Sequence, residues 1–95
     1  RVFTLDDYYA QLKAISTHNI YSDFNNSVEE TVKYIKAKMF LIISETDLLV
    51  NPTEPKKFAE LSNSKFLLLK NNCGHLAVTC EMDKCREEIA KFLNE

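Results

Sequence analysis

The chain has 95 residues, of which 45% are apolar and 27% are charged, and its formal net charge is −2. A chain of this length forms one domain at most, and its slightly acidic balance argues against nucleic acid or an anionic membrane surface as the main partner. No apolar run reaches the roughly 20 residues that cross a bilayer, and the first residues do not resemble a signal peptide.

Capping patterns mark the first two expected helices. Thr4 and Asp7 have the spacing of a capping box, and they precede a helix over about 5–16. Ser27, which stands three residues before a glutamate, opens a second helix over about 28–35. The apolar residues of the first helix fall on one face, and we expect its tyrosines to pack rather than to contact a substrate. This face carries Leu5, Tyr8, Tyr9, Leu12 and Ile15.

Two apolar runs without alternation predict strands that are covered on both faces. They are KMFLIIS at 38–44 and KFLLLK at 65–70. Between them, Thr53 can cap a helix over about 54–62, and a last amphipathic helix spans about 82–93. Two buried strands joined by one helix form a right-handed parallel βαβ unit, so the expected fold class is α/β.

Two strands are too few for a finished parallel sheet. We therefore expect the chain to be the C-terminal part of a larger α/β domain, and the absence of an initial Met favours the same interpretation. Residues 1–35 would then be a helical lead-in, and residues 36–95 the last two strands with their helices. The first strand would lack its neighbour, so we expect the isolated chain to form a homodimer or a strand-edge assembly through residues 38–44.

The three cysteines, Cys73, Cys80 and Cys85, are an odd number in a chain without a recognisable secretory signal. Reduced thiols in a cytoplasmic protein are the expected state. Together with His75, these cysteines match no common zinc-ligand spacing, so we expect half-buried thiols and no metal site.

Each predicted strand is followed by a loop that carries a residue suited to proton transfer. Glu45 and Asp47 follow the first strand, and Gly74 and His75 lie in the expected loop NNCGHLAVTC after the second. The carboxyl ends of adjacent parallel strands meet at one edge of a sheet, about 4.8 Å apart, so side chains from both loops can form a hydrogen bond. We expect Asp47 and His75 to be this pair, with Glu45 as the rival acid. His18 lies in a polar segment and is expected on the surface.

A carboxylate beside a histidine has a defined chemical use. The carboxylate accepts a hydrogen bond from one ring nitrogen and fixes the tautomer, which leaves the other nitrogen free to take a proton from a nucleophile. Gly74 would help to orient the imidazole, because glycine adopts backbone angles that other residues resist. The pattern therefore predicts a catalytic acid–base pair, Asp47 and His75.

The order of these features resembles the C-terminal segment of an α/β-hydrolase-fold enzyme. The segment YIKAKMFLIISETDLLVNPTEPKKFAELSNSKFLLLKNNCGHLAV contains strand, acid loop, proline, helix, strand and Gly-His in the order of that fold, which has three layers, αβα. Within the fold the chain is most similar to the homoserine O-acetyltransferase family. DDYYAQLKAISTHNI resembles that family's helix that ends in a His-Asp-Ile-Gly-type stretch, and SVEETVKYIKAK resembles its lead into the penultimate strand. By this match Asp47 is the triad acid and His75 the triad base.

The resemblance implies an acyltransferase that works through a nucleophile–His–Asp triad, with this chain supplying the acid and the base. Its partners would be a small-molecule acyl acceptor and an acyl donor, with acyl-CoA as the donor that the family uses. No other cofactor is expected, because the chain has no glycine-rich phosphate loop. Two alternatives stay open: an α/β-hydrolase acting on a small ester or amide, and a non-catalytic structural or interaction fragment.

Three features depart from the family pattern. The G-x-S-x-G nucleophile motif and its oxyanion donors are absent, since Gly74 is the only glycine, so the chain alone is expected to be inactive. Leu76 follows the histidine where the family has an Asp that helps to hold the amino group of the substrate. Asn19 also stands where the family often has Asp. These departures leave the identity of the acyl acceptor open.

Overall fold

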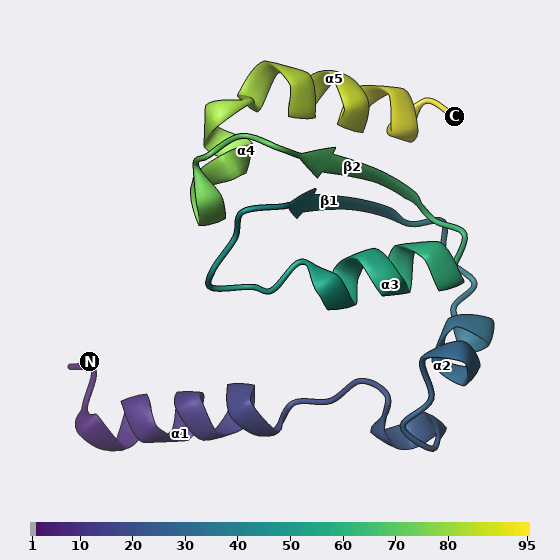
Figure 1. Ribbon diagram of the computed structural model, residues 1–95. Helices are drawn as coiled ribbons and strands as arrows, with labels where there is room; N and C mark the ends of the chain where they lie inside the picture. Colours follow the sequence, from purple (N-terminus) through teal and green to yellow (C-terminus); the bar gives the residue numbers. More distant parts are fainter. Residues whose placement is uncertain (1) are drawn as a thin grey trace.

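The computed structural model describes residues 2–95 and has a mixed α/β fold with one parallel pair of strands (Figure 1). The helix α3 connects the two strands, as a βαβ unit requires. The elements in chain order are α1 (Leu5–Thr17), the 3-10 turn η1 (Ser22–Phe24), α2 (Val28–Tyr34), β1 (Phe40–Ser44), α3 (Thr53–Leu61), β2 (Lys65–Leu69), the 3-10 turn η2 (Gly74–Leu76), α4 (Ala77–Cys80) and α5 (Met82–Leu93).

Side-chain caps explain where the first two helices begin. At α1, the Thr4 hydroxyl accepts from the Asp7 amide while the Asp7 carboxylate accepts from the Thr4 amide, so the predicted capping box is confirmed. At α2, the Ser27 hydroxyl accepts from the amide of Glu30, but the Glu30 carboxylate accepts from Asn25 instead of returning a bond to Ser27. The second box is therefore only half formed.

The start of α3 differs from the expectation. Pro52 occupies the N-cap position, and Thr53 is already helical. The amide of Thr53 donates to the Asn51 side chain, which satisfies one of the free donors at this helix end. Proline tolerates this position because its missing N–H would have no partner inside the helix.

The strands β1 and β2 pair in parallel, with Phe40 opposite Lys65 and Ser44 opposite Leu69. One further bond, from the Glu45 amide to the Leu69 carbonyl, extends the pairing past the end of β1. Both strands therefore end at the same edge of the sheet, beside the loops that carry the predicted acid and base.

Helices cover the strand pair from both sides. On one face, Leu69 packs in a buried cluster with Ala77 and with Cys85 of α5. On the other face, α3 buries Phe58 and Ala59, and α3 and α5 lie on opposite sides of the strands in Figure 1. The cover is incomplete, because Phe66 in β2 is 45% exposed. The expectation that both strands are covered on both faces is therefore met only in part.

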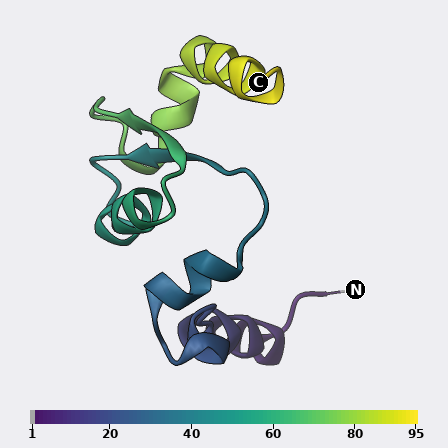
Figure 2. The ribbon, with the colours of Figure 1, turned by 90° about the vertical axis from the view of Figure 1, so that its right-hand side faces the viewer.

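The N-terminal helix contributes nothing to this core. No residue of α1 is buried, and Figures 1 and 2 show α1 at the edge of the molecule, away from the sheet. The expected packing of the tyrosines is wrong for the most part: Tyr9 is exposed, and Tyr8 is half exposed and makes only an edge-to-face contact with Phe3. The apolar face of α1 is therefore open to solvent.

The predicted loop before the last helix is partly helical. Residues 74–76 form η2 and residues 77–80 form α4, where only irregular structure was expected. The last helix has the expected bounds, Met82–Leu93. Among residues 2–95, no helix combines the length and the apolar character that a membrane span needs.

Candidate active site

The acid and the base lie on the two loops that leave the same edge of the sheet. Asp47 is three residues beyond the end of β1, and His75 lies in η2, which follows β2 after a short turn. The Asp47 Oδ2 atom is 2.9 Å from the His75 Nδ1 atom. A carboxylate can only accept a hydrogen bond, so Nδ1 carries the hydrogen and Nε2 of a neutral ring keeps its lone pair.

The two side chains differ sharply in exposure. The Asp47 side chain is only 10% exposed, whereas that of His75 is 53% exposed. The carboxylate is therefore shielded behind the imidazole, and the ring is open to a reactant. This is the arrangement that an orienting acid and a proton-accepting base require.

Asp47 is held as an anion by several donors. Its Oδ1 atom accepts from the amides of Leu49 at 2.8 Å and Val50 at 3.0 Å, and its Oδ2 atom faces His75. These interactions, led by the Val50 amide and then by His75, hold the pKa of the Asp47 carboxyl below its ordinary value, against the opposing effect of burial. The loop thus keeps the acid charged and turned toward the base.

Gly74 makes the turn that presents His75. Its φ is +59°, a left-handed conformation that disfavours other residues. A Cβ atom added here would lie 3.5 Å from the Thr46 carbonyl oxygen, which is an ordinary contact. The requirement for glycine at this position is therefore conformational rather than a matter of space.

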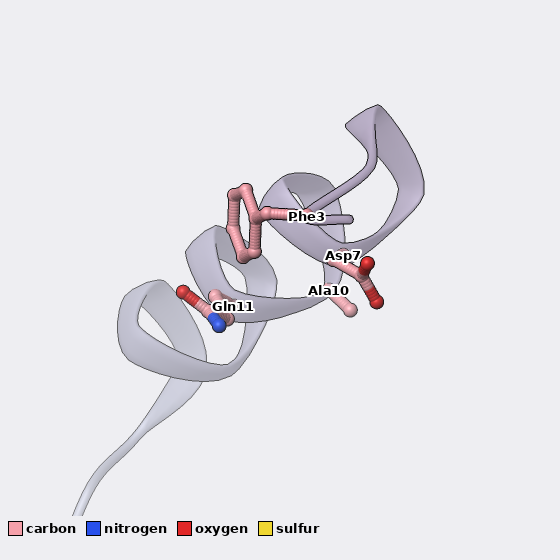
Figure 3. Close-up of a pocket in the computed structure, with 4 residues that line it drawn as sticks. All are labelled: Phe3, Asp7, Ala10 and Gln11. Carbon is pink, nitrogen blue, oxygen red and sulfur yellow. The ribbon is translucent and has the colours of Figure 1, made fainter. Parts of the chain in front are cut away.

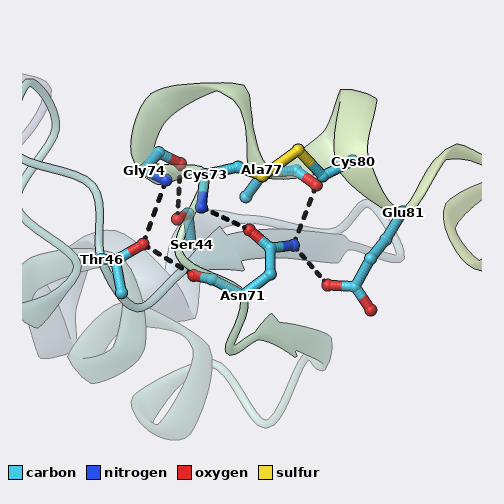
Figure 4. Close-up of a disulfide and its surroundings, with 8 residues drawn as sticks. All are labelled: Ser44, Thr46, Asn71, Cys73, Gly74, Ala77, Cys80 and Glu81. Carbon is cyan, nitrogen blue, oxygen red and sulfur yellow. Dashed lines mark hydrogen bonds between the residues drawn. A yellow bond between two sulfur atoms is a disulfide. The ribbon is translucent and has the colours of Figure 1, made fainter.

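Two hydroxyl groups, one at the end of β1 and one in the acid loop, hold the backbone of the base loop, and sequence reasoning did not identify them. The Ser44 hydroxyl donates to the Gly74 carbonyl at 2.7 Å, and the Thr46 hydroxyl accepts from the Gly74 amide at 3.1 Å while it donates to the Asn71 carbonyl at 2.9 Å (Figure 4). Their sequence signal is weak: two hydroxyl residues alternate with acids from the last residue of β1 onward. Their targets lie 25 to 30 residues away, so no local pattern identifies them.

The Asn71 side chain organises the turn from within. Its Oδ1 atom accepts from the Cys73 amide at 3.0 Å, and its Nδ2 atom donates to the Ala77 carbonyl at 3.2 Å and to the Glu81 carboxylate (Figure 4). One side chain thereby joins the start of the turn to both ends of α4.

A disulfide joins Cys73 to Cys80, which corrects the expectation of three reduced thiols. Only Cys85 is a free thiol, and it is buried. The bond closes the short segment that contains His75, and it leaves Cys73 without a thiolate that could act as a nucleophile. Disulfides persist chiefly in oxidising compartments, so this pairing does not favour the cytoplasmic location, which stays a prediction.

The other candidate residues lie apart from the pair. Glu45, the rival acid, is 3.8 Å from Lys56 rather than beside the imidazole. His18 is exposed at the end of α1, as expected. Asn19 accepts from the Tyr21 amide in a local turn. Leu76 adjoins the base and is 65% exposed.

A hollow elsewhere on the surface has no connection with the pair. It is lined by Phe3, Asp7, Ala10 and Gln11, all on or just before α1 (Figure 3). A single helix and the residues before it form this surface, so it encloses no reactant. Within the described part of the chain, no group of three or more His, Cys, Asp or Glu side chains could hold a metal ion.

Comparison with known proteins gives no relative for this chain. No protein-family model, no curated protein and no solved structure matches it. The Asp47–His75 hydrogen bond, at the carboxyl ends of two parallel strands, is the feature of the chain that points to a function.

Proposed function

We propose that this chain supplies the acid and the base of a nucleophile–His–Asp triad in an α/β-hydrolase-fold acyltransferase. The observation that carries the proposal is the 2.9 Å contact between Asp47 Oδ2 and His75 Nδ1, with the imidazole open to solvent. The parallel βαβ unit, with the acid after one strand and Gly-His after the next, supports the same fold. Residues 1–35 would come from the cap region, and residues 36–95 would end the α/β domain.

In this proposal the two residues have separate roles. The Nε2 atom of His75 takes the proton from a serine or cysteine nucleophile as that nucleophile attacks an acyl carbonyl, and the same nitrogen returns the proton to the leaving group. Asp47 holds the ring in the required tautomer and stabilises the imidazolium that forms. The nucleophile and the oxyanion donors belong to a segment outside these 95 residues, since the chain contains no G-x-S-x-G motif.

The acyl acceptor and donor follow from the resemblance to homoserine O-acetyltransferases, which implies an amino-acid hydroxyl and an acyl-CoA. One observation favours the alternative, a hydrolase that acts on a small ester or amide. Leu76 exposes an apolar side chain directly beside the base, where an aspartate would be needed to hold an amino group. An apolar substituent fits that position better than a charged amine.

The test is to express the complete reading frame that contains this chain and to assay both activities. Acetyl transfer from acetyl-CoA to homoserine and hydrolysis of a short-chain aryl ester separate the two enzyme classes. We expect His75→Ala and Asp47→Asn to lower the kcat of whichever activity is present by on the order of 10³-fold or more. His18→Ala and Glu45→Gln are the matched controls, and each should retain activity.

The 95-residue chain alone should hydrolyse the ester no faster than a free imidazole does, because it has no activated nucleophile. A full-length protein without either activity would support the non-catalytic alternative. Full activity in His75→Ala would contradict the proposal.

A further inference from the structure

We propose that Thr46 and Ser44 are positioning residues that hold His75 on Asp47 by fixing the backbone of Gly74. The inference deepens the proposed function and rests on it, because the orientation of the imidazole matters to a reaction only if His75 acts as the base. Both hydroxyls bond the backbone of Gly74, the residue that precedes His75, and act on the imidazole through it.

The two hydroxyls reach both polar groups of the Gly74 backbone. Ser44 donates to the Gly74 carbonyl, and Thr46 accepts from the Gly74 amide. Gly74 stands directly before His75, and its left-handed conformation sets the direction in which the chain leaves the turn. Holding both the N–H and the C=O of Gly74 therefore fixes the backbone position from which the His75 side chain extends.

Thr46 has a second role, because its hydroxyl is both acceptor and donor. It donates to the Asn71 carbonyl, so a single oxygen atom bridges the start and the middle of the base loop. Thr46 is also the residue directly before Asp47. The Thr46 hydroxyl therefore links the loop of the acid to the loop of the base, and removing it should let the two loops move independently.

The geometric requirement explains why such a bridge is useful. Asp47 and His75 lie on separate loops, and η2 has only three residues, too few to hold its own position. A displacement of about 1 Å can cost a catalytic group on the order of 10²-fold in rate. All three contacts of these hydroxyls are partly buried, so water competes with them less than with a surface bond.

The experiment measures the tautomer of His75 and needs no activity. In long-range ¹H–¹⁵N correlation spectra at mildly alkaline pH, where imidazoles are neutral, wild-type His75 should show the single tautomer with hydrogen on Nδ1. Thr46→Val keeps the shape of the side chain and removes the hydroxyl. We expect His75 in this variant to lose the fixed tautomer and to give the averaged signal of the exposed His18, which serves as the internal reference.

Three further variants make the result specific. Thr46→Ser keeps the hydroxyl and should restore the Nδ1–H tautomer, a rescue that a purely structural role for the threonine methyl would not give. Thr17→Val removes a hydroxyl that donates to the Lys13 carbonyl on α1 and should change nothing at His75. Ser44→Ala removes only the bond to the Gly74 carbonyl, and it too should release the tautomer. If Thr46→Val does not fold, which loss of the dispersed amide signals of β1 and β2 would show, the result for Ser44→Ala decides the test.

The outcomes separate this inference from the proposed function. A fixed Nδ1–H tautomer in the wild type that persists in Thr46→Val and Ser44→Ala overturns the positioning role and leaves the acid–base pair intact. A wild-type His75 with no fixed tautomer contradicts the pair itself, and both proposals fail. In the full-length enzyme, loss of kcat in Thr46→Val with an unchanged KM, reversed in Thr46→Ser, supports both.

Discussion

Asp47 couples the charge of the candidate site to the stability of its loop. Its carboxylate accepts from the amides of Leu49 and Val50 and faces the His75 ring, and together these interactions lower its pKa below the ordinary value of 3.8. A group with a lowered folded-state pKa stabilises the fold fully above its unfolded pKa. That contribution is lost as the pH falls through the folded value.

We therefore expect acidification from near-neutral pH to below 3.8 to destabilise the wild type more than Asp47→Asn. The amide of Asn can still accept from the two backbone donors, so the variant removes mainly the charge. The melting temperature of both proteins, measured across this range, checks the prediction. The carboxyls of Glu29, Glu88 and Glu95 also have lowered pKa values and titrate in both proteins, so the difference between the two curves isolates Asp47. Parallel curves would contradict it.

Gly74 gives a second prediction at the scale of one residue. A Cβ atom fits the space, but the left-handed backbone costs an ordinary residue about 1–2 kcal/mol. Gly74→Ala should lower the free energy of unfolding by about this amount, and Gly74→Asn by less, since Asn25, Asn26 and Asn63 already adopt this conformation here. Urea unfolding of the matched pair measures the difference. Equal losses in the two variants would show that the cost comes from contacts of the added Cβ atom and not from the left-handed backbone conformation.

At the scale of the element, the segment from residue 71 to residue 80 differs from the helices around it. The helices α1 and α5 follow from local signals, a capping box in one and an apolar period in the other, so the sequence predicted them well. The helical turns η2 and α4 are too short to be stable alone. They depend on Asn71, on Thr46 and on the disulfide, and of these contacts the Thr46 bond and the disulfide leave no local pattern in the sequence.

The same contrast holds for the candidate site. Asp47 and His75 could be paired from the sequence because strand ends and parallel topology determine where their loops emerge. The hydroxyls of Ser44 and Thr46 could not, because a serine or threonine near the end of a strand is common and its partner is known only once the loops are placed. The open face of α1 was also unforeseen, since an apolar helical period predicts burial without naming what covers it.

The disulfide gives a prediction for this segment. Cys73 and Cys80 are separated by 7 positions, and closing so short a loop stabilises the fold by about 2 kcal/mol in the chain-entropy account. Reduction with a dithiol should lower the free energy of unfolding by about that amount. The double variant Cys73→Ser, Cys80→Ser should start at the reduced value and not respond to the reductant. Unchanged wild-type stability on reduction would contradict a structural role for the bond.

At the scale of the whole molecule, the chain is more open than a compact protein of its size. Its radius of gyration is 16.1 Å, against about 12 Å for a compact chain of equal length. Its accessible surface is 7470 Å², against about 5,600 Å² for a folded protein of this mass. The excess comes partly from the uncovered apolar face of α1 and the incompletely covered strands. Apolar surface of this extent favours association with another surface.

The free edge of β1 is the specific place where we expect association. The Glu45 amide donates a hydrogen bond to the Leu69 carbonyl of β2. The amides of successive residues in a strand point to alternate sides, so those of Phe40 and Ile42 point away from β2. In the described part of the chain the sheet has only two strands, and this side of β1 has no strand partner. An unpaired edge of this kind is a template for another strand.

We therefore expect the isolated chain to form a symmetric dimer through residues 38–44, or larger strand-edge assemblies, at micromolar concentration. The side chains of β1 are already partly buried in the monomer, so each contributes less on association than the roughly 1.5–3 kcal/mol of a fully exposed residue. The unpaired backbone groups of the edge supply the rest of the driving force. Ile42 packs against the buried cluster of Leu69, Ala77 and Cys85, so Ile42→Ala and Ile42→Pro both lose that packing, and only Ile42→Pro also removes the edge N–H. Sedimentation velocity should show the dimer for the wild type, a weakened dimer for Ile42→Ala, and a monomer for Ile42→Pro. If the wild type stays a compact monomer at high micromolar concentration, or if the two variants dissociate equally, pairing through this strand edge is wrong.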